Sequence, residues 1–288
     1  MQAGTPSRTA WAAAAHRAAH QVLEHGIIFN DPLALKILGA DEETLARDAE
    51  QPSRRRMRIF IAARTRFAED ALVPAVARGV TQLVVLGAGL DTYAYRGAVR
   101  DRLRIFEVDH PSTQSWKRQR LHDAGIAIPD SLTYAPIDFE HQTLADGLKA
   151  AGFDQSQQTF FTWLGVTPYL TKDAIRATLG FIASLPNGAH VVFDYSDPPA
   201  SLDAEARASH QVRAARVAKI GEAWVSYFEA EELRAMLTGF GFTEIEDRGP
   251  RQIAAVYFPD RAANLPEKGG HIVRAARVPV GLVAGLPT

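Results

Sequence analysis

The chain has 288 residues, of which 47% are hydrophobic and 23% are charged, and its formal net charge at pH 7 is -1. This length can form one large α/β domain with a substantial core. The near-neutral charge gives no electrostatic basis for binding nucleic acid or an anionic membrane. The absence of cysteine excludes disulfides, thiolate metal sites and a cysteine nucleophile. With no apolar run long enough to cross a membrane and no signal-peptide core at the N-terminus, we expect a soluble, cytoplasmic protein.

The N-terminal part has the pattern of helices. A helix is predicted over 9–25, with Thr9 as its cap and Gly26 as its stop. A turn at 30–32 begins a second helix, and apolar residues at helical spacing predict a long amphipathic helix over 52–78. We expect residues 1–78 to form an N-terminal helical cap.

From residue 81 onward the pattern changes to short strands that alternate with helices. Strands are predicted over 82–86, 103–108, 132–137, 158–163, 189–194, 241–247 and 271–277, and helices over 111–124, 140–151, 171–184 and 229–239. The polar segment 197–222 is predicted to be a helical insertion over the active site. This alternation predicts one α/β domain over 1–288, a Rossmann-like fold with a doubly wound, mostly parallel, seven-stranded sheet.

Two acids lie at a familiar distance from a glycine turn. The first strand runs into Gly87 and Gly89, followed by Asp91, and the second ends on Glu107 and Asp109. From Gly87 to Asp109 is 22 residues (109 minus 87), close to the roughly 20-residue spacing of nucleotide-binding βαβ units. Glycines let the backbone approach a ligand, and a carboxylate can hold ribose hydroxyls. The alternative is a simple turn with solvated acids.

Thr92 occupies the place of the third glycine in the dinucleotide fingerprint. A ligand with a ribose but no pyrophosphate fits this change. The module therefore indicates an adenosine-containing ligand other than NAD.

Three further residues are candidates for the same ligand. Asp138 and Phe139 follow the third strand, where the carboxylate could accept from the adenine amine and the ring could form an apolar wall; alternatively Asp138 caps a helix. Arg64 lies in an apolar stripe, and an inward-facing arginine needs an anion. That anion is either the carboxylate of an amino-acid-like ligand or an acid of the core.

Other basic groups have simpler interpretations. The run Arg54 to Arg58 is interpreted as a solvated helix face. His16 and His20 have metal-ligand spacing, but Arg17 stands where a zinc protease needs its glutamate, so an exposed helix face is expected. The motifs of serine hydrolases and P-loop NTPases do not occur, and no metal site is predicted.

The motif Gly87-Ala88-Gly89-Leu90-Asp91-Thr92 with Tyr95-Arg96, together with Phe106-Glu107-Val108-Asp109-His110-Pro111, resembles the leucine carboxyl methyltransferase family. The likeness is strongest to its bacterial branch of S-adenosylmethionine-dependent O-methyltransferases, some of which are linked to polyketide pathways. Residues 31–34, 62–67 and the segment from 223 to 242 resemble other motifs of that branch. The resemblance implies a class I methyltransferase fold with S-adenosyl-L-methionine as cofactor.

Transferred residue by residue, the resemblance implies that Arg64 meets the methionine carboxylate of the cofactor. It also implies that Gly87 packs against the cofactor, that Asp109 binds the ribose, and that Asp138 with Phe139 lies at the adenine. Eukaryotic members carry a glutamate where this chain has Leu164. That contact, and with it their protein-phosphatase substrate, does not transfer.

The resulting hypothesis is methyl transfer to a carboxylate or hydroxyl of a small molecule, such as a secondary metabolite. A carboxylate is ionised near pH 7 and needs no base, whereas a hydroxyl does; Tyr195, Tyr169 and His110 are the candidate bases on the acceptor side. Asp194 with Tyr195 could also touch the acceptor.

Two alternatives are an NAD(P)-dependent oxidoreductase and a catalytically silent cofactor-binding module. The missing third glycine and the lack of a Tyr-x-x-x-Lys pair weigh against the oxidoreductase. The sequence does not predict an oligomeric state.

Overall fold

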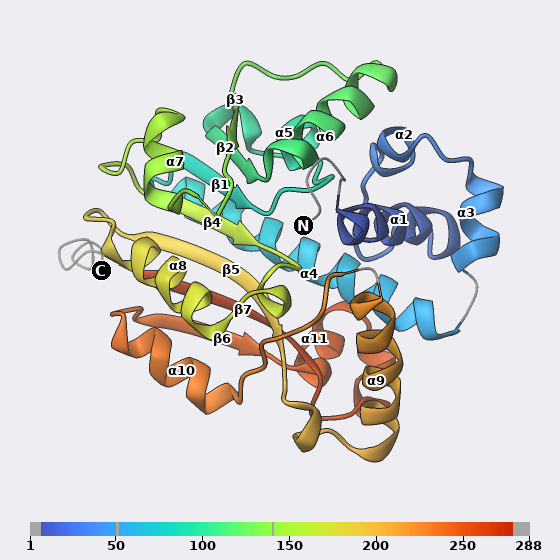
Figure 1. Ribbon diagram of the computed structural model, residues 1–288. Helices are drawn as coiled ribbons and strands as arrows, with labels where there is room; N and C mark the ends of the chain where they lie inside the picture. The colour runs from blue at the N-terminus through green and yellow to red at the C-terminus, as the bar shows by residue number, and fades with distance from the viewer. Residues whose placement is uncertain (1–6, 50–51, 140, 220, 279–288) are drawn as a thin grey trace, which may run out of the picture.

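The computed structural model describes residues 7–49, 52–139, 141–219 and 221–278, and its centre is a seven-stranded sheet (Figure 1). The strands are β1 (Gln82–Leu86), β2 (Arg104–Asp109), β3 (Leu132–Pro136), β4 (Thr159–Trp163), β5 (Ala189–Ser196), β6 (Glu244–Arg248) and β7 (Gly270–Arg277). Their order is β3-β2-β1-β4-β5-β7-β6, and β7 runs antiparallel to both β5 and β6 while all other pairs are parallel. The doubly wound, mostly parallel sheet is therefore confirmed.

Two helical layers cover the sheet. On one face α7 (Leu144–Ala150), α8 (Lys172–Ser184) and α10 (Ala230–Gly239) pack on residues such as Val84, Phe106 and Phe161. On the other face α4 (Pro52–Ala77) and α11 (Pro250–Tyr257) pack on Leu83, Ile105 and Phe160. Because the side chains of a strand alternate between faces, neighbouring residues of β1 enter different cores. The two faces thus bury β1 completely.

The N-terminal helices form a third core beside the sheet. They are α1 (Arg8–Leu23), α2 (Ala34–Leu38) and α3 (Glu42–Ala49), and their alanines and leucines pack on Leu90 and on Leu121 of α6 (Pro111–Asp123). Ser7, not Thr9, caps α1, because its hydroxyl accepts from the backbone N–H of Ala10. The predicted cap residue was therefore wrong by two positions.

The cap is attached to the sheet through the buried carboxylate of Asp31. Its Oδ2 lies 2.9 Å from Arg17 Nε and accepts from the Thr92 hydroxyl at 2.8 Å. Arg17 also donates to the Leu90 carbonyl at 2.7 Å. Arg96, in the short helix α5 (Tyr93–Arg96), donates to the Thr92 hydroxyl at 2.8 Å. Thr92 stands at the position of the third glycine of the dinucleotide fingerprint, and here its hydroxyl joins the turn after β1 to the cap.

One alternative for Asp138 is wrong, and one helix was not predicted. Helix α7 begins at Leu144 with Thr143 as its cap, so Asp138 is not a helix cap. Helix α11 was not predicted, because the segment is short and its Pro250 start lies between two strands. The predicted insertion does contain a helix, α9 (Ala204–Ala218).

The run from Arg54 to Arg58 is not uniformly a solvated face. The Arg58 side chain is buried and donates to both carboxylate oxygens of Glu24 on α1, at 2.7 and 2.6 Å. This pair ties the long helix α4 to the cap.

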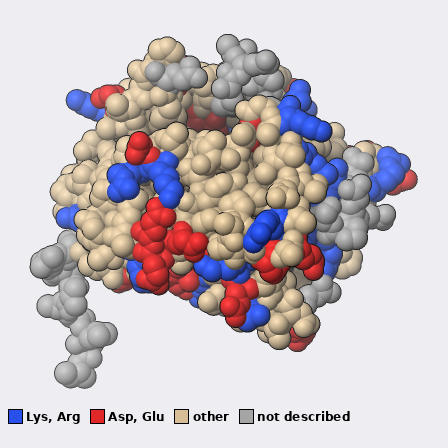
Figure 2. Space-filling view, turned by 60° about the horizontal axis from the view of Figure 1, so that its bottom comes forward, with Lys and Arg blue, Asp and Glu red and all other residues tan. Residues whose placement is uncertain are grey.

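None of the helices in the described ranges is long and apolar enough to span a membrane. Figure 2 shows basic and acidic side chains lying next to one another on one face of the molecule. This interspersion agrees with the near-neutral net charge.

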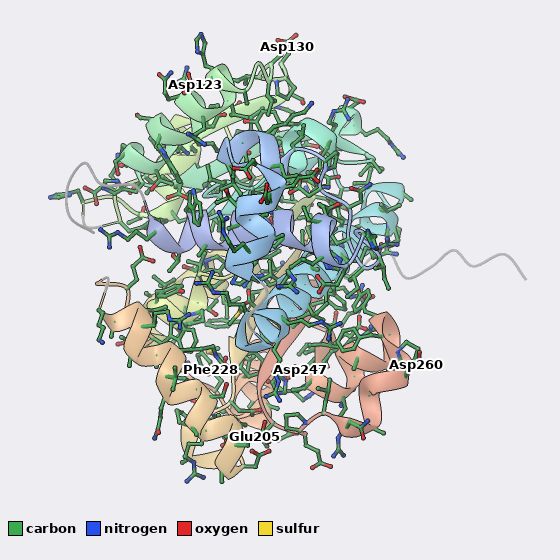
Figure 3. The ribbon with its side chains drawn as sticks, turned by 90° about the vertical axis from the view of Figure 1, so that its right-hand side faces the viewer. Asp123, Asp130, Glu205, Phe228, Asp247 and Asp260 are labelled. Atoms are coloured by element: carbon green, nitrogen blue, oxygen red, sulfur yellow. The ribbon has the colours of Figure 1, made fainter. Side chains whose placement is uncertain are left out.

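Removing the Asp31 carboxylate should strongly destabilise the protein. In Asp31→Ala the buried Arg17 loses its only carboxylate partner among the described residues while Arg96 keeps Glu69, and breaking a buried pair typically costs about 3 kcal/mol or more. Urea unfolding should show this loss, whereas Asp130→Ala, an exposed carboxylate labelled in Figure 3, should change stability by less than about 0.5 kcal/mol. Equal stability of the two variants would contradict the anchoring role of Asp31.

Candidate cofactor and acceptor site

The turn after β1 accepts only glycine at two positions. Gly87 and Gly89 have φ of +63° and +47°, in the left-handed region that side chains disfavour. A Cβ on Gly89 would lie 2.9 Å from the Ala10 Cβ of α1, and one on Gly87 would lie 2.4 Å from Val166 Cγ2. The turn therefore sits between the cap and the loop that follows β4.

Asp109, at the tip of β2, holds this turn. Its Oδ2 accepts from the Gly89 N–H at 2.6 Å, and its Oδ1 accepts from the His110 N–H at 2.7 Å. Burial raises the pKa of Asp109, although the hydrogen bonds from the Gly89 and His110 N–H groups favour its ionised form and oppose the shift. Each carboxylate oxygen has a second lone pair, so both can accept from ribose hydroxyls. The predicted juxtaposition of glycine turn and acid is present.

Glu107 is placed differently from Asp109. It is fully buried, and its Oε2 lies 2.6 Å from Lys117 Nζ of α6. Burial raises the pKa of Glu107 to about 7, although Lys117 opposes the shift. Its carboxylate supports α6 beneath the site, which leaves Asp109 as the acid that a ribose can reach.

The adenine-side candidates lie at the tips of the neighbouring strands. Phe139, beyond β3, is 60% exposed, which is unusual for a phenylalanine. The preceding Asp138 lies 2.9 Å from His141 Nδ1 through its Oδ2. Asp91 accepts from the Tyr93 N–H at 2.7 Å and so begins α5. An exposed ring beside an acid offers the apolar wall and the polar contact that an adenine needs.

Arg64 of α4 meets an acid of the core. Its Nη1 lies 2.9 Å from Asp194 Oδ2 on β5, and Asp194 Oδ1 accepts from the Gly165 N–H at 2.5 Å. The guanidinium is packed over Gly165, where a Cβ would lie 2.6 Å from Nη2. The buried Nε of Arg64 has no hydrogen-bond partner among the described residues. The ion pair therefore uses only part of this guanidinium, and a ligand anion can take the rest.

Tyr195 does not have the geometry of a catalytic base. It is buried, and its hydroxyl donates to Asp247 Oδ2 at 2.7 Å and lies 3.1 Å from His271 Nδ1. Burial, with Asp247 beside it, raises its pKa. Because side chains alternate along β5, Tyr195 faces away from Asp194 and Arg64. Its hydroxyl is held in a structural hydrogen-bond network, and a catalytic role for it stays a prediction that this geometry disfavours.

His110 also has a structural position. Its Nδ1 accepts from the Ser112 N–H at 3.2 Å and lies 2.7 Å from the Ser112 hydroxyl, so the imidazole caps α6. Sequence patterns could not separate this role from a catalytic one, because both place a histidine directly after a strand.

Tyr169 lies where an acceptor could be bound. It belongs to a short 3-10 helix after β4, in the loop whose Gly165 lies under the Arg64 guanidinium. Burial raises its pKa. Glu222 accepts from the Arg8 and Thr9 N–H groups at 3.1 and 3.3 Å, so the segment that carries Trp224 is joined to the start of α1.

His16 lies near arginines of α4, which the sequence did not predict. It is only partly exposed, and burial together with Arg58, Arg54 and Arg64 lowers its pKa to about 4. His20 is fully buried and lies 3.2 Å from Glu24 Oε2, so the expected exposed histidine face was wrong. The sequence pattern predicts on which face of the helix His16 lies. It does not predict that this face meets the arginines of α4.

Positive charge is in excess around His16. Arg58 pairs with Glu24, and Arg64 pairs with Asp194. Arg54 has no acidic partner within the described part of the chain. Arg54 is therefore the arginine near His16 whose charge no carboxylate of the described residues balances.

The cavity beside the glycine turn is small. It has a volume of about 20 Å³ and is lined by residues including Glu69, Asp91 and Leu164. This is room for roughly one water molecule. The cavity lies between α4 and the sheet, and none of Gly87, Gly89 and Asp109 lines it.

Strand order and site together define the class of protein. The NAD-binding order 3-2-1-4-5-6 has no antiparallel strand inserted beside its last parallel one, whereas here β7 lies between β5 and β6. A crystal structure from Thermobifida fusca, named "putative methyltransferase", matches 96% of this chain and 97% of its own, with a TM-score of 0.56 and 16% identity. The carbon methyltransferase of CurJ matches 94% of this chain and 67% of its own, with a TM-score of 0.52 and 15% identity. The fold is that of the Rossmann-like methyltransferases.

The model of the family named "Leucine carboxyl methyltransferase" matches residues 10–183. A relative in Bacillus subtilis (strain 168), named "Putative S-adenosyl-L-methionine-dependent methyltransferase YktD", is 35% identical over 207 residues, which are 70% of this chain and 67% of the relative. A relative of like name in Frankia alni is 35% identical over 166 residues, 55% of this chain and 57% of its own. The chain belongs to the leucine carboxyl methyltransferase family, which confirms the predicted family and, with it, the class of S-adenosylmethionine-dependent methyltransferases.

The acids around His271 should make stability depend on pH. Burial alone would lower its pKa, but hydrogen bonds to Asp197 and Asp247 raise it to about 9. The pKa of His271 in the folded protein is therefore higher than its value of about 6.5 in the unfolded chain. The charged imidazole stabilises the fold by about 3 kcal/mol, and this contribution is complete below pH 6.5. It is lost as the pH rises through 9.

Urea unfolding of the wild type and of His271→Gln at about pH 6 and about pH 9.5 measures this contribution. The difference between the two proteins should be large at the lower pH and should shrink at the higher one. His122→Gln, which changes an exposed histidine, should match the wild type at both. A difference that does not depend on pH would disprove the charged state of His271.

Proposed function

We propose that this protein transfers a methyl group from S-adenosylmethionine to the carboxylate of a small molecule. The observation that carries the proposal is the Asp109 carboxylate, which holds the Gly89 N–H and keeps a free lone pair on each oxygen. A ribose has the two vicinal hydroxyls that such a carboxylate binds.

The remaining residues fit the other parts of this cofactor. The buried, unpartnered Nε of Arg64 can donate to the methionine carboxylate, and the exposed Phe139 ring can cover the adenine beside Asp138. When bound, S-adenosylmethionine supplies a methyl group on a positively charged sulfur. The contribution of the protein is to orient the acceptor oxygen towards that carbon and to exclude water.

A carboxylate acceptor fits the described side chains better than a hydroxyl acceptor does. The reaction forms a bond from a carboxylate oxygen to the methyl carbon and breaks the bond from carbon to sulfur, whose electron pair returns to sulfur, so no proton moves. Tyr195 and His110 are engaged in structural hydrogen bonds, and burial raises the pKa of Tyr169. The excess of arginine around His16 favours an anionic acceptor.

The names of the bacterial relatives support the methyl donor, since they are called S-adenosyl-L-methionine-dependent methyltransferases. A cytoplasmic location and a role in secondary metabolism stay predictions. The silent cofactor-binding module is the competing hypothesis, and the oxidoreductase is disfavoured by the position of β7.

Asp109→Asn should weaken the binding of S-adenosylhomocysteine. The amide keeps one acceptor oxygen but loses the charge and the other acceptor, so the Kd should rise by about ten- to a hundredfold, or roughly 1–3 kcal/mol. Isothermal titration measures this change, and the exposed Asp123→Asn should bind like the wild type. An unchanged Kd for Asp109→Asn would refute the ribose assignment, and tight binding of NADH without S-adenosylhomocysteine would refute the methyl donor.

The product should be a methyl ester. With labelled S-adenosylmethionine and a panel of carboxylic acids and phenols, the label should enter carboxylic acids and should be released as methanol by alkali, which cleaves esters but not aryl ethers. Label that resists alkali would show a hydroxyl acceptor instead. Bound cofactor without turnover of any acid or phenol would favour the silent module.

A further inference from the structure

Helix α9 carries two buried polar groups on one face that lack hydrogen-bond partners. His210 is 5% exposed, and neither of its ring nitrogens has a partner among the described residues. Arg213 lies one turn further on, and its Nε is also buried without a partner, although its Nη1 donates to the Ser209 hydroxyl at 2.7 Å. Native proteins rarely leave such groups unsatisfied, so a cluster of them calls for a ligand.

Two aromatic rings lie against His210. The Trp224 ring centroid is 5.3 Å away at an interplanar angle of 50°, and that of Tyr227 is 5.4 Å away at 59°. Both rings are only half-buried. They belong to the segment 223–228, which is fastened to the loop after β4 because the Val225 N–H donates to the Pro168 carbonyl at 2.7 Å. The rings and α9 together make an aromatic surface around an imidazole.

This surface continues the acceptor side of the site. The hydrogen bond from the Val225 N–H to the Pro168 carbonyl brings the residue after Trp224 against the loop of Tyr169. The Arg64 guanidinium packs over Gly165 of that loop. The surface therefore extends from Arg64 through Tyr169 and Trp224 to His210 and Arg213.

The surface is also cationic. Arg213 has no acidic partner in the part of the chain that the structure describes, and its neighbour Arg56 is paired with the exposed Glu205, labelled in Figure 3. A half-buried guanidinium that has a buried Nε–H and no carboxylate of its own selects an oxygen-bearing, electron-rich group.

We propose that His210, Arg213, Trp224 and Tyr227 recognise the part of the acceptor that is remote from the methylated carboxylate, and that this part is an aromatic ring bearing an oxygen substituent. The ring packs against Trp224 and Tyr227, and the imidazole N–H and the Arg213 Nε–H donate to the oxygen. The acceptor is thus a hydroxylated aromatic acid. This inference rests on the proposed function for the reaction, but its binding test does not require turnover.

The test uses calorimetry of the full chain with 4-hydroxycinnamate, cinnamate and cyclohexanecarboxylate, each with and without S-adenosylhomocysteine. The wild type should bind the hydroxylated aromatic acid most tightly and the alicyclic acid least tightly. His210→Phe keeps a ring but removes both nitrogens, and Arg213→Met keeps the stem but removes the guanidinium. Each variant should bind 4-hydroxycinnamate about tenfold more weakly or worse, as expected when a hydrogen bond to a buried group is lost, and cinnamate with unchanged affinity.

Two controls separate this subsite from folding and from cofactor binding. Arg216→Met changes an exposed arginine of the same helix and should leave every affinity unchanged. His210→Phe should bind S-adenosylhomocysteine like the wild type, and its Tm should be equal or higher because it removes two unsatisfied buried nitrogens. Loss of cofactor binding in the wild type would overturn the proposed function without affecting the acid-binding measurement.

Several results would overturn the inference. They are a wild type that binds none of the hydroxylated aromatic acids, equal affinity for the aromatic and alicyclic acids, or unchanged 4-hydroxycinnamate binding in both variants. A fall in the Tm of His210→Phe would assign the imidazole a structural role instead.

Discussion

The buried carboxylate of Asp31 is the interaction on which the arrangement of the site depends. It joins Arg17 of the N-terminal cap to Thr92 in the turn after β1, and Arg96 extends the network to Glu69 of α4 at 2.6 Å. A buried carboxylate is tolerated only when it is paired, so all these groups must come together for any of them to be buried. The cap and the glycine turn are therefore positioned as one unit, and Ala10 of the cap closes over Gly89.

A second constraint is the placement of charge at the carboxyl end of the sheet. Asp109 sits at the tip of β2 with two backbone N–H groups, and Arg64 meets Asp194 at the tip of β5. Both tips lie at the same edge of the sheet because these strands are parallel, and β1 and β4 lie between them. An adenosine joined to an amino acid carries a ribose towards one end and a carboxylate at the other. In the site, Asp109 and Arg64 are likewise apart from each other.

The covering elements decide what can reach that edge. Glu222 fastens the segment after α9 to the start of α1, and Val166 fills the space above Gly87. A loop that lies over a bound ligand excludes water from it. The side chains that would meet an acceptor, from His16 on α1 to His210 on α9, therefore come from elements far apart in the chain.

The sequence by itself determined the elements that depend on local pattern. The alternation of short apolar runs with helical spacing was sufficient for all seven strands, because periodicity is a local property. The spacing of the two glycines from Asp109 also predicted that the turn and the acid meet. Only the tertiary structure decided which partner each polar group would find. Arg58 and His20 turned inward to Glu24, Tyr195 turned away from the site, and Thr92 took a position next to Asp31. The physical reason is that a buried charge or hydroxyl is satisfied by whatever group the fold brings within hydrogen-bond distance, and that group is distant in the sequence.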